Sequence, residues 1–130
     1  MFSYEWFPED EVDDLSDTER VFLKRLRERA GSWNHPPEST QLVEPDNELL
    51  YWRAVFDIVD EAKNRHLFTI GLCFDGASIW GGELDQYYRP VPWDRSRVEF
   101  IQVGGAPEDL AEIAADWFER VLAGLMAPRT

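Results

Sequence analysis

The segment 67–84, LFTIGLCFDGASIWGGEL, constrains the fold of this chain more than any other segment. It contains two apolar runs that are separated by Asp75-Gly76. An Asp-Gly pair in that position is the strongest short-range signal for a β-hairpin, because both central residues of a type I′ turn need positive φ. The sequence therefore predicts a hairpin over 67–84.

A two-residue turn also fixes which residues of the hairpin lie opposite one another. The expected pairs are Phe74 with Ala77, Cys73 with Ser78, Leu72 with Ile79 and Gly71 with Trp80. In this register the indole of Trp80 covers the bare backbone of Gly71. The next two residues, Gly81-Gly82, permit a bulge or the close approach of another backbone.

A helix is predicted over residues 17–30. The preceding Ser16 and the residue Glu19 have the spacing of a capping box, in which each side chain accepts a hydrogen bond from a free backbone N–H. Gly31 stands where a C-terminal cap belongs. An apolar stripe recurs at helical spacing, formed by Leu15, Phe22, Leu26 and Ala30. Basic residues occupy much of the remaining surface, namely Arg20, Lys24, Arg25, Arg27 and Arg29.

Segment 48–65 fits two different structures. We expect a helix, because the segment is long for a strand and because its basic end, at Lys63 and Arg65, suits the helix dipole. The strand alternative fits the alternation equally well, and its aromatic and β-branched content supports it. One face of that strand would carry Leu50, Trp52, Ala54, Phe56 and Ile58. In both structures the apolar face belongs to the core.

The rest of the chain completes an α+β pattern. Residues 97–103 alternate as a strand, and residues 107–125 have the apolar stripe of a closing helix with Pro107 in its first turn. The order of elements predicts a small antiparallel sheet covered by helices. The sheet is expected to contain hairpin 67–84 and strand 97–103, and the covering helices to include 17–30 and 107–125.

Charge limits the classes of partner that the chain can bind. The net charge of −13 repels nucleic-acid phosphates and anionic lipids and attracts basic proteins, so we expect no direct binding of nucleic acid. The charge is uneven, because residues 1–19 contain no Lys or Arg. The acidic residues there are Glu5, Glu9, Asp10, Glu11, Asp13, Asp14, Asp17 and Glu19.

This distribution predicts an acidic, aromatic arm at residues 1–15 and a single α+β domain at residues 16–130. At 130 residues with 44% apolar content, the chain is expected to bury one core. Three alternatives remain open for the arm. It docks on the basic helix 17–30, docks on a basic partner, or is disordered when the protein is alone.

The sequence predicts a cytoplasmic protein. No run approaches the roughly 20 consecutive apolar residues of a membrane span, and the amino terminus is acidic where a signal peptide is basic and then apolar. Cys73 is the only cysteine and lies in an apolar run, which predicts a buried thiol in a reducing compartment. The excess of Arg over Lys is typical of a GC-rich bacterial genome.

We expect no catalytic, metal or cofactor site. Neither His35 nor His66 has a partner at a metal-ligand spacing, and no nucleophile motif such as G-x-S-x-G is present. Gly104-Gly105 precedes a helix but lacks the lysine of a phosphate-binding loop. A small enzyme that uses clustered carboxylates stays open as an alternative, because two or three of them in one cleft suffice for acid–base or magnesium chemistry.

The loop 85–96, DQYYRPVPWDRS, is the predicted partner-binding site. Tyr, Trp and Arg dominate binding hot spots, and the prolines at positions 90 and 92 favour an extended loop. The residues expected to contact a partner are Tyr87, Tyr88, Arg89, Trp93 and Asp94. The alternative is that the three aromatic residues fold back onto the sheet as part of the core.

In type, the chain resembles the small acidic immunity proteins encoded beside bacterial polymorphic toxins. The features that carry the resemblance are the FDGASIW hairpin followed by GGEL, the aromatic loop and the closing helix with DWFERVL. Such proteins bind and block a cognate toxin, often a basic nuclease, through an acidic surface. The resemblance therefore implies an inhibitor with a basic protein partner, and a subunit of a larger assembly is a further alternative.

Overall fold

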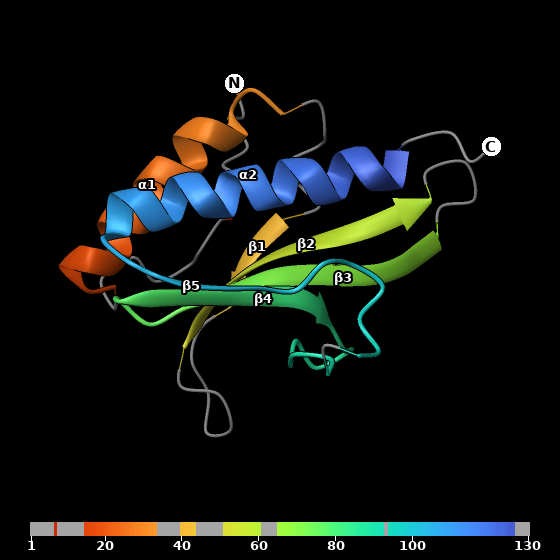
Figure 1. The fold of residues 1–130 in the computed structure, drawn as a ribbon. Helices are drawn as coiled ribbons and strands as arrows, with labels where there is room; N and C mark the ends of the chain where they lie inside the picture. The colour runs from red at the N-terminus through yellow and green to blue at the C-terminus, as the bar shows by residue number, and fades with distance from the viewer. Residues whose placement is uncertain are drawn as a thin grey trace.

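The computed structural model describes residues 7, 15–33, 40–43, 51–60, 65–92 and 94–126. Over these residues the chain forms two α-helices and one five-stranded antiparallel sheet, with both helices on the same face of the sheet (Figure 1). The predicted α+β class, with helices covering a small antiparallel sheet, is therefore confirmed.

The strands lie across the sheet in their order along the chain, each antiparallel to its neighbours. They are β1 (Thr40–Val43), β2 (Trp52–Asp60), β3 (Arg65–Phe74), β4 (Ser78–Leu84) and β5 (Ile101–Gly104). Because neighbouring strands are consecutive, the sheet needs no crossover connection. The edges of the described sheet are β1 and β5.

Along the chain, helix α1 (Asp17–Ala30) precedes the five strands and helix α2 (Pro107–Met126) follows them. The predicted capping box of α1 is present. Ser16 Oγ accepts a hydrogen bond from the Glu19 N–H at 3.2 Å, and the Glu19 carboxylate accepts one from the Ser16 N–H at 2.8 Å. Gly31 follows α1 with a φ of −57°, so the helix ends in a right-handed conformation.

The expectation of a helix over 48–65 is wrong. β2 occupies this segment, and Trp52, Ala54 and Phe56 point toward the helices as the strand alternative required. Arg53 and Val55 point to the other face and are also buried. The two arguments for a helix failed because the segment is not one element: β2 covers nine of its residues, and Arg65, part of its basic end, already begins β3. Residues 48–50 and 61–64 lie outside the described residues.

The predicted hairpin is present, but its predicted register is wrong by two residues. Phe74 lies opposite Ile79, Cys73 lies opposite Trp80, Leu72 lies opposite Gly81 and Gly71 lies opposite Gly82. Trp80 therefore does not cover Gly71. A shift of two residues keeps every side chain on its expected face of the sheet.

The turn chemistry of Asp75 explains the shifted register. Its carboxylate accepts hydrogen bonds from the N–H groups of Ala77 and Ser78 at 2.9 and 2.7 Å, while Gly76 takes a φ of 98°. Burial raises the pKa of the Asp75 carboxyl, but these donors outweigh it and hold the pKa below its ordinary value. The side chain thus closes a longer turn than the two-residue type I′ turn.

The strand predicted at 97–103 begins only at Ile101. The backbone of the preceding residues is used by other partners, since the Glu99 carbonyl accepts a hydrogen bond from Trp117 Nε1 at 3.0 Å. The Arg97 N–H donates to Glu83 Oε1 at 2.9 Å. Because these backbone groups are bonded elsewhere, the pairing with β4 begins only where Ile101 lies opposite Gly81.

The core lies between the helices and the sheet. Phe22 of α1 stacks on Phe74 of β3, with ring centroids 4.1 Å apart. Trp117 and Phe118 of α2 are fully buried, and their rings meet edge to face at 4.9 Å. Aromatic packing therefore attaches both helices to one face of the sheet.

Phe7 shows where part of the predicted arm lies. Its ring is fully buried beside Trp33 and Phe118, at centroid distances of 6.2 and 5.4 Å. Its N–H donates to Thr40 Oγ1 at 2.8 Å, and its carbonyl accepts from Arg27 Nη2 at 3.0 Å. At Phe7 the chain is thus docked on α1 and β1, as the intramolecular alternative required. The other residues of the arm before Leu15 lie outside the described residues.

Two leucine side chains lie over glycine backbones in the middle of the sheet. Leu72 lies over Gly81 on the helix-covered face, and Leu84 lies over Gly71 on the opposite face. A Cβ atom at Gly81 would also lie 2.7 Å from the carbonyl oxygen of Gly71. No rotamer change relieves a clash with backbone, so this site requires glycine.

We predict that Gly81→Ala lowers the free energy of unfolding by about 1–3 kcal/mol, because the added methyl displaces Leu72 and the Gly71 backbone. Gly124→Ala is the matched control. Gly124 is an exposed position of α2 with no atom within 4 Å of an added Cβ, so the same substitution should stabilise by up to about 1 kcal/mol. Urea denaturation of both variants measures the difference, and equal effects would contradict this account of the packing.

Candidate binding surface

The face of the sheet turned away from α1 and α2, which we call the open face, carries exposed aromatic side chains. No described helix lies on this face (Figure 1). Trp80 points to it, because Trp80 lies opposite Cys73 and next to Ile79, which points into the helix-covered core. Tyr51 directly precedes β2 and its ring meets that of Trp80, whereas Phe100 directly precedes β5 and lies beside Gly82 of β4. We call Tyr51, Trp80 and Phe100 the aromatic patch.

Two rings of the aromatic patch are exposed, and the third, that of Trp80, is half-buried. Tyr51 and Trp80 meet edge to face, with ring centroids 4.8 Å apart. Phe100 packs beside Gly82, where an added Cβ would lie 3.7 Å from its ring. Tyr51 is 36% exposed and Phe100 is 46% exposed. Aromatic side chains that are held against a sheet in this way offer contact area at little cost in conformational entropy.

Residues 85–89 of the predicted binding loop form a tight turn, whereas the sequence predicted an extended segment. Asp85 organises this turn. The Asp85 carboxylate accepts hydrogen bonds from the N–H groups of Tyr87 and Arg89 at 2.8 and 3.1 Å, and the Asp85 N–H donates to the Arg89 carbonyl at 2.9 Å. Pro90 then lies opposite Leu84. The prolines therefore do not extend the loop, because Asp85 folds it back along β4.

The predicted site residues divide into two groups. Tyr87 is 61% exposed, and the Arg89 guanidinium lies over its ring at 5.2 Å. Tyr88 is half-buried, and its carbonyl accepts a hydrogen bond from Arg53 Nη1 at 2.9 Å. Asp94 is exposed, and Trp93 lies outside the described residues. The loop thus presents Tyr87 and Arg89 together at the surface and holds Tyr88 against the sheet.

Tyr88 connects the loop to the open face. Its hydroxyl accepts a hydrogen bond from Gln41 Nε2 of β1 at 2.7 Å, and its φ of 60° is left-handed, which is uncommon for a bulky side chain. The contacts with Gln41 and Arg53 hold this conformation. The fold-back alternative for the loop therefore describes Tyr88 correctly but not Tyr87.

Cys73 lies beneath this part of the open face, opposite Arg53 of β2. Both side chains are 1% exposed. Burial raises the pKa of the Cys73 thiol to about 11, although the charge of Arg53 acts in the opposite direction. The thiol stays protonated at neutral pH and is inert, as expected for a buried structural cysteine.

A β-bulge brings together the polar side chains of Asp57, His66 and Thr69, which the sequence analysis did not predict. The pairing of β2 with β3 skips Leu67, so that His66 and Thr69 point to the same face. His66 Nε2 lies 3.0 Å from Thr69 Oγ1, which donates to Asp57 Oδ1 at 2.9 Å. The threonine hydroxyl is buried and points its proton at the carboxylate, so it is not placed as a nucleophile for His66 to activate.

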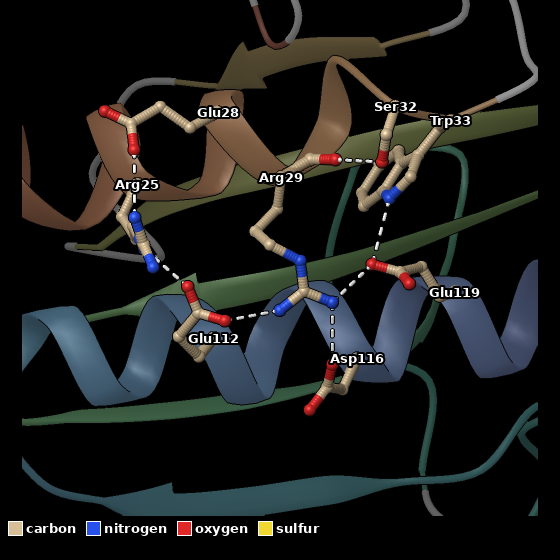
Figure 2. Close-up of polar contacts among 8 residues, drawn as sticks. All are labelled: Arg25, Glu28, Arg29, Ser32, Trp33, Glu112, Asp116 and Glu119. Atoms are coloured by element: carbon tan, nitrogen blue, oxygen red, sulfur yellow. Dashed lines mark hydrogen bonds and ion pairs between the residues drawn. The ribbon is translucent and has the colours of Figure 1, made fainter.

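A cluster of charged side chains lies between the helices (Figure 2). Arg29 of α1 donates to Glu112, Asp116 and Glu119 of α2, with N···O distances of 2.5, 2.7 and 2.6 Å. Arg25 pairs with Glu112 and Glu28, and Trp33 Nε1 donates to Glu119 at 3.1 Å. The basic face predicted for helix 17–30 is thus neutralised in part by the acidic face of the closing helix.

The electrostatics of this cluster disfavour a catalytic role for its carboxylates. Hydrogen bonds from Arg29 and then Arg25 hold the pKa of Glu112 below its ordinary value. The hydrogen bond to Asp116 is the largest influence on Arg29, whose pKa is raised. A general acid at neutral pH needs a carboxyl whose pKa is raised, so Glu112 is suited to an ion pair and not to proton transfer.

Comparisons with protein-family models, with curated proteins and with solved structures gave no match. The function must therefore be inferred from the chemistry of this chain. Within the described residues, no three or more His, Cys, Asp or Glu side chains are grouped so as to hold a metal ion. Neither described helix is long and apolar enough to cross a membrane.

Arg29→Gln should lower the free energy of unfolding at pH 7 by about 1 kcal/mol, because it leaves three carboxylates of α2 without their shared cation. Glu112 stabilises the fold only while it is ionised. Its contribution is complete above the ordinary glutamate pKa of about 4.3 and is lost as the pH falls through its lower folded-state pKa. The stabilities of wild type and variant should therefore converge in acid.

Urea denaturation across this pH range tests the prediction. Lys24→Gln is the control, because Lys24 is an exposed cation of the same helix and its loss should change stability by less than about 0.5 kcal/mol. A deficit for Arg29→Gln that is the same in acid as at neutral pH would show that ionised carboxylates are not its cause.

The two neighbouring tyrosines of the loop should respond differently to truncation. Tyr88→Ala removes the hydrogen bond to Gln41 and the packing on the open face, so we expect a loss of about 1–2 kcal/mol in thermal or urea unfolding. Tyr87→Ala removes an exposed ring and should change stability by less than about 0.5 kcal/mol. Similar losses for both variants would mean that the loop is not anchored through Tyr88.

Proposed function

We propose that this chain is a protein-binding inhibitor of the immunity type, and that it contacts its partner through the aromatic patch and the exposed tip of the 85–89 loop. The observation that carries the proposal is the presence of Tyr51, Trp80 and Phe100 on the sheet face that carries neither of the two described helices. Exposed aromatic side chains supported by a sheet are typical of binding hot spots. Tyr87 and Arg89 extend this chemistry at the end of β4.

The charge of the protein supports a basic partner, although part of the acidic surface is neutralised within the molecule. The net charge of −13 favours encounter with a basic protein. However, Glu112, Asp116 and Glu119 are bound by Arg29, so the acidic face of α2 attracts a partner less than its sequence suggests. In this proposal the charge accelerates association, and the aromatic patch supplies most of the affinity.

The resemblance to immunity proteins suggests which basic partner to test first. A basic toxin, such as a nuclease, would be attracted by the net charge and blocked by a tightly bound acidic domain. The alternative of a small enzyme with clustered carboxylates has less support. Glu112 is held by arginines in an ionised state, and Thr69 is not placed as a nucleophile.

The test uses the full chain as an affinity reagent in lysate of the cells that produce it. We expect wild-type protein to retain a specific protein, and Trp80→Ser combined with Phe100→Ser to lose it. Val21→Ser is the matched control, because Val21 is an exposed apolar residue of α1 with 37% exposure. Its variant should retain the same protein. Retention by the double variant at wild-type level, with both variants folded, would refute a role for the aromatic patch.

The salt dependence of binding to the purified partner tests the role of charge separately. Association should slow as ionic strength rises, whereas dissociation should change little, because screened long-range charge mainly affects encounter. An association rate that is insensitive to salt would remove the argument for a basic partner.

A further inference from the structure

The edge strand β5 offers hydrogen-bonding groups that no described strand uses. β5 is the last strand of the sheet, and Gln102 and Gly104 in it are exposed. The register and one hydrogen bond determine where its backbone points. The Gly105 N–H donates to the Ala77 carbonyl at 3.0 Å, which makes Gly105 and Ala77 a hydrogen-bonded pair.

Hydrogen-bonded and non-hydrogen-bonded pairs alternate along an antiparallel ladder. Val103 and Ile101 therefore direct their N–H and C=O groups toward β4, where they lie opposite Ile79 and Gly81. Gln102 and Gly104 direct theirs away from the sheet. An incoming strand would bond to these two residues.

β5 is short, with four residues, but within the part of the chain that the structure describes this edge lacks the other features that usually protect an edge strand. Charged residues, proline, a bulge or a covering segment normally block it. The sequence of β5, IQVG, has no charge and no proline. By contrast, the far end of β4 is covered, because Pro90 lies opposite Leu84 and the Val91 N–H donates to the Glu83 carbonyl. At the other edge, Thr40 of β1 binds the N–H of Phe7.

We infer that β5 receives an extended segment of the protein partner as a sixth strand of the sheet. This inference rests on the proposed function, since the added strand would lie beside Phe100 at the margin of the aromatic patch. Backbone hydrogen bonds supply affinity in such strand addition, and alternate side chains supply specificity.

The two sides of β5 indicate the chemistry of that segment. Ile101 and Val103 are half-buried against the core, so the partner side chains on the helix side are expected to be apolar. Gln102 and Phe100 face the open side of a strongly acidic protein, where basic side chains gain from charge and from contact with aromatic rings. The segment therefore alternates apolar and basic residues.

A second copy of this chain fits the edge less well. Its β5 would bring the same neutral sequence, but each copy carries a net charge of −13 and repels the other. The charge favours a basic partner over self-association.

The probe for this inference is a short fluorescent peptide of alternating valine and lysine, titrated against the full chain. We expect it to bind wild type and Gln102→Ala alike, and to bind Gln102→Pro about tenfold more weakly. Proline removes the outward N–H of Gln102 and places its ring where the strand would dock, while the bonds of Ile101 and Val103 to β4 remain. Gln102→Ala keeps the backbone and loses only the side chain.

A second measurement does not depend on the folding of the proline variant. Hydrogen exchange of the Gln102 and Gly104 amides, followed by NMR on wild-type protein, should slow when the peptide is added. An otherwise identical peptide, N-methylated at alternate residues on its bonding edge, should neither bind nor slow the exchange.

The possible results separate this inference from the proposed function. No binding of the peptide, full binding by Gln102→Pro, or unchanged exchange at both amides would overturn strand addition. If the aromatic double variant also loses the natural partner while Gln102→Pro keeps it, the proposed function stands and the sixth strand does not. Self-association of the protein that Gln102→Pro abolishes would assign the edge to a second copy and overturn the assignment to a basic partner.

Discussion

The packing of both helices on one face of the sheet is the constraint on which the rest of the structure depends. Phe22, Trp117 and Phe118 bury that face, and the Arg29 cluster joins the helices to each other. Because both described helices lie on that face, the other face consists of strand side chains and of contacts with the loop after β4. Tyr51 and Phe100 are exposed for this reason, and β5 beside them pairs on one side only with a described strand.

The parts of this fold that could be predicted are those whose sequence signals are local. Helix 17–30 could be predicted because its capping box is local, and the hairpin because Asp75-Gly76 is local. The register could not, because the Asp75 carboxylate closes a longer turn with two backbone donors. The helix expected over 48–65 was wrong because the segment was taken as one long element, whereas β2 ends at Asp60 and β3 begins at Arg65.

The candidate site was harder to predict than the fold, because its residues come together only across strands. Trp80 belongs to β4, whereas Phe100 precedes β5 and Tyr51 precedes β2. No spacing in the sequence relates them. The loop was recognised from its composition, but Tyr87 and Tyr88 are adjacent and identical in type, and only the contacts with Gln41 and Arg53 distinguish their roles. The group around His66 depends on a bulge, which shifts a side chain to the other face without a strong sequence signal.

The Arg29 cluster also has a consequence for the synthesis of the protein. Arg29 bonds to residues that follow it by 83, 87 and 90 positions, so α1 emerges from the ribosome long before α2 can meet it. Until then the apolar stripe of α1 lacks its second helix, and the sheet is covered only in part. Folding of such long-range contacts is slow to begin and depends on late segments. The nascent chain therefore completes this core only after α2 has left the ribosome, and a chain interrupted before α2 would expose apolar surface to proteases and chaperones.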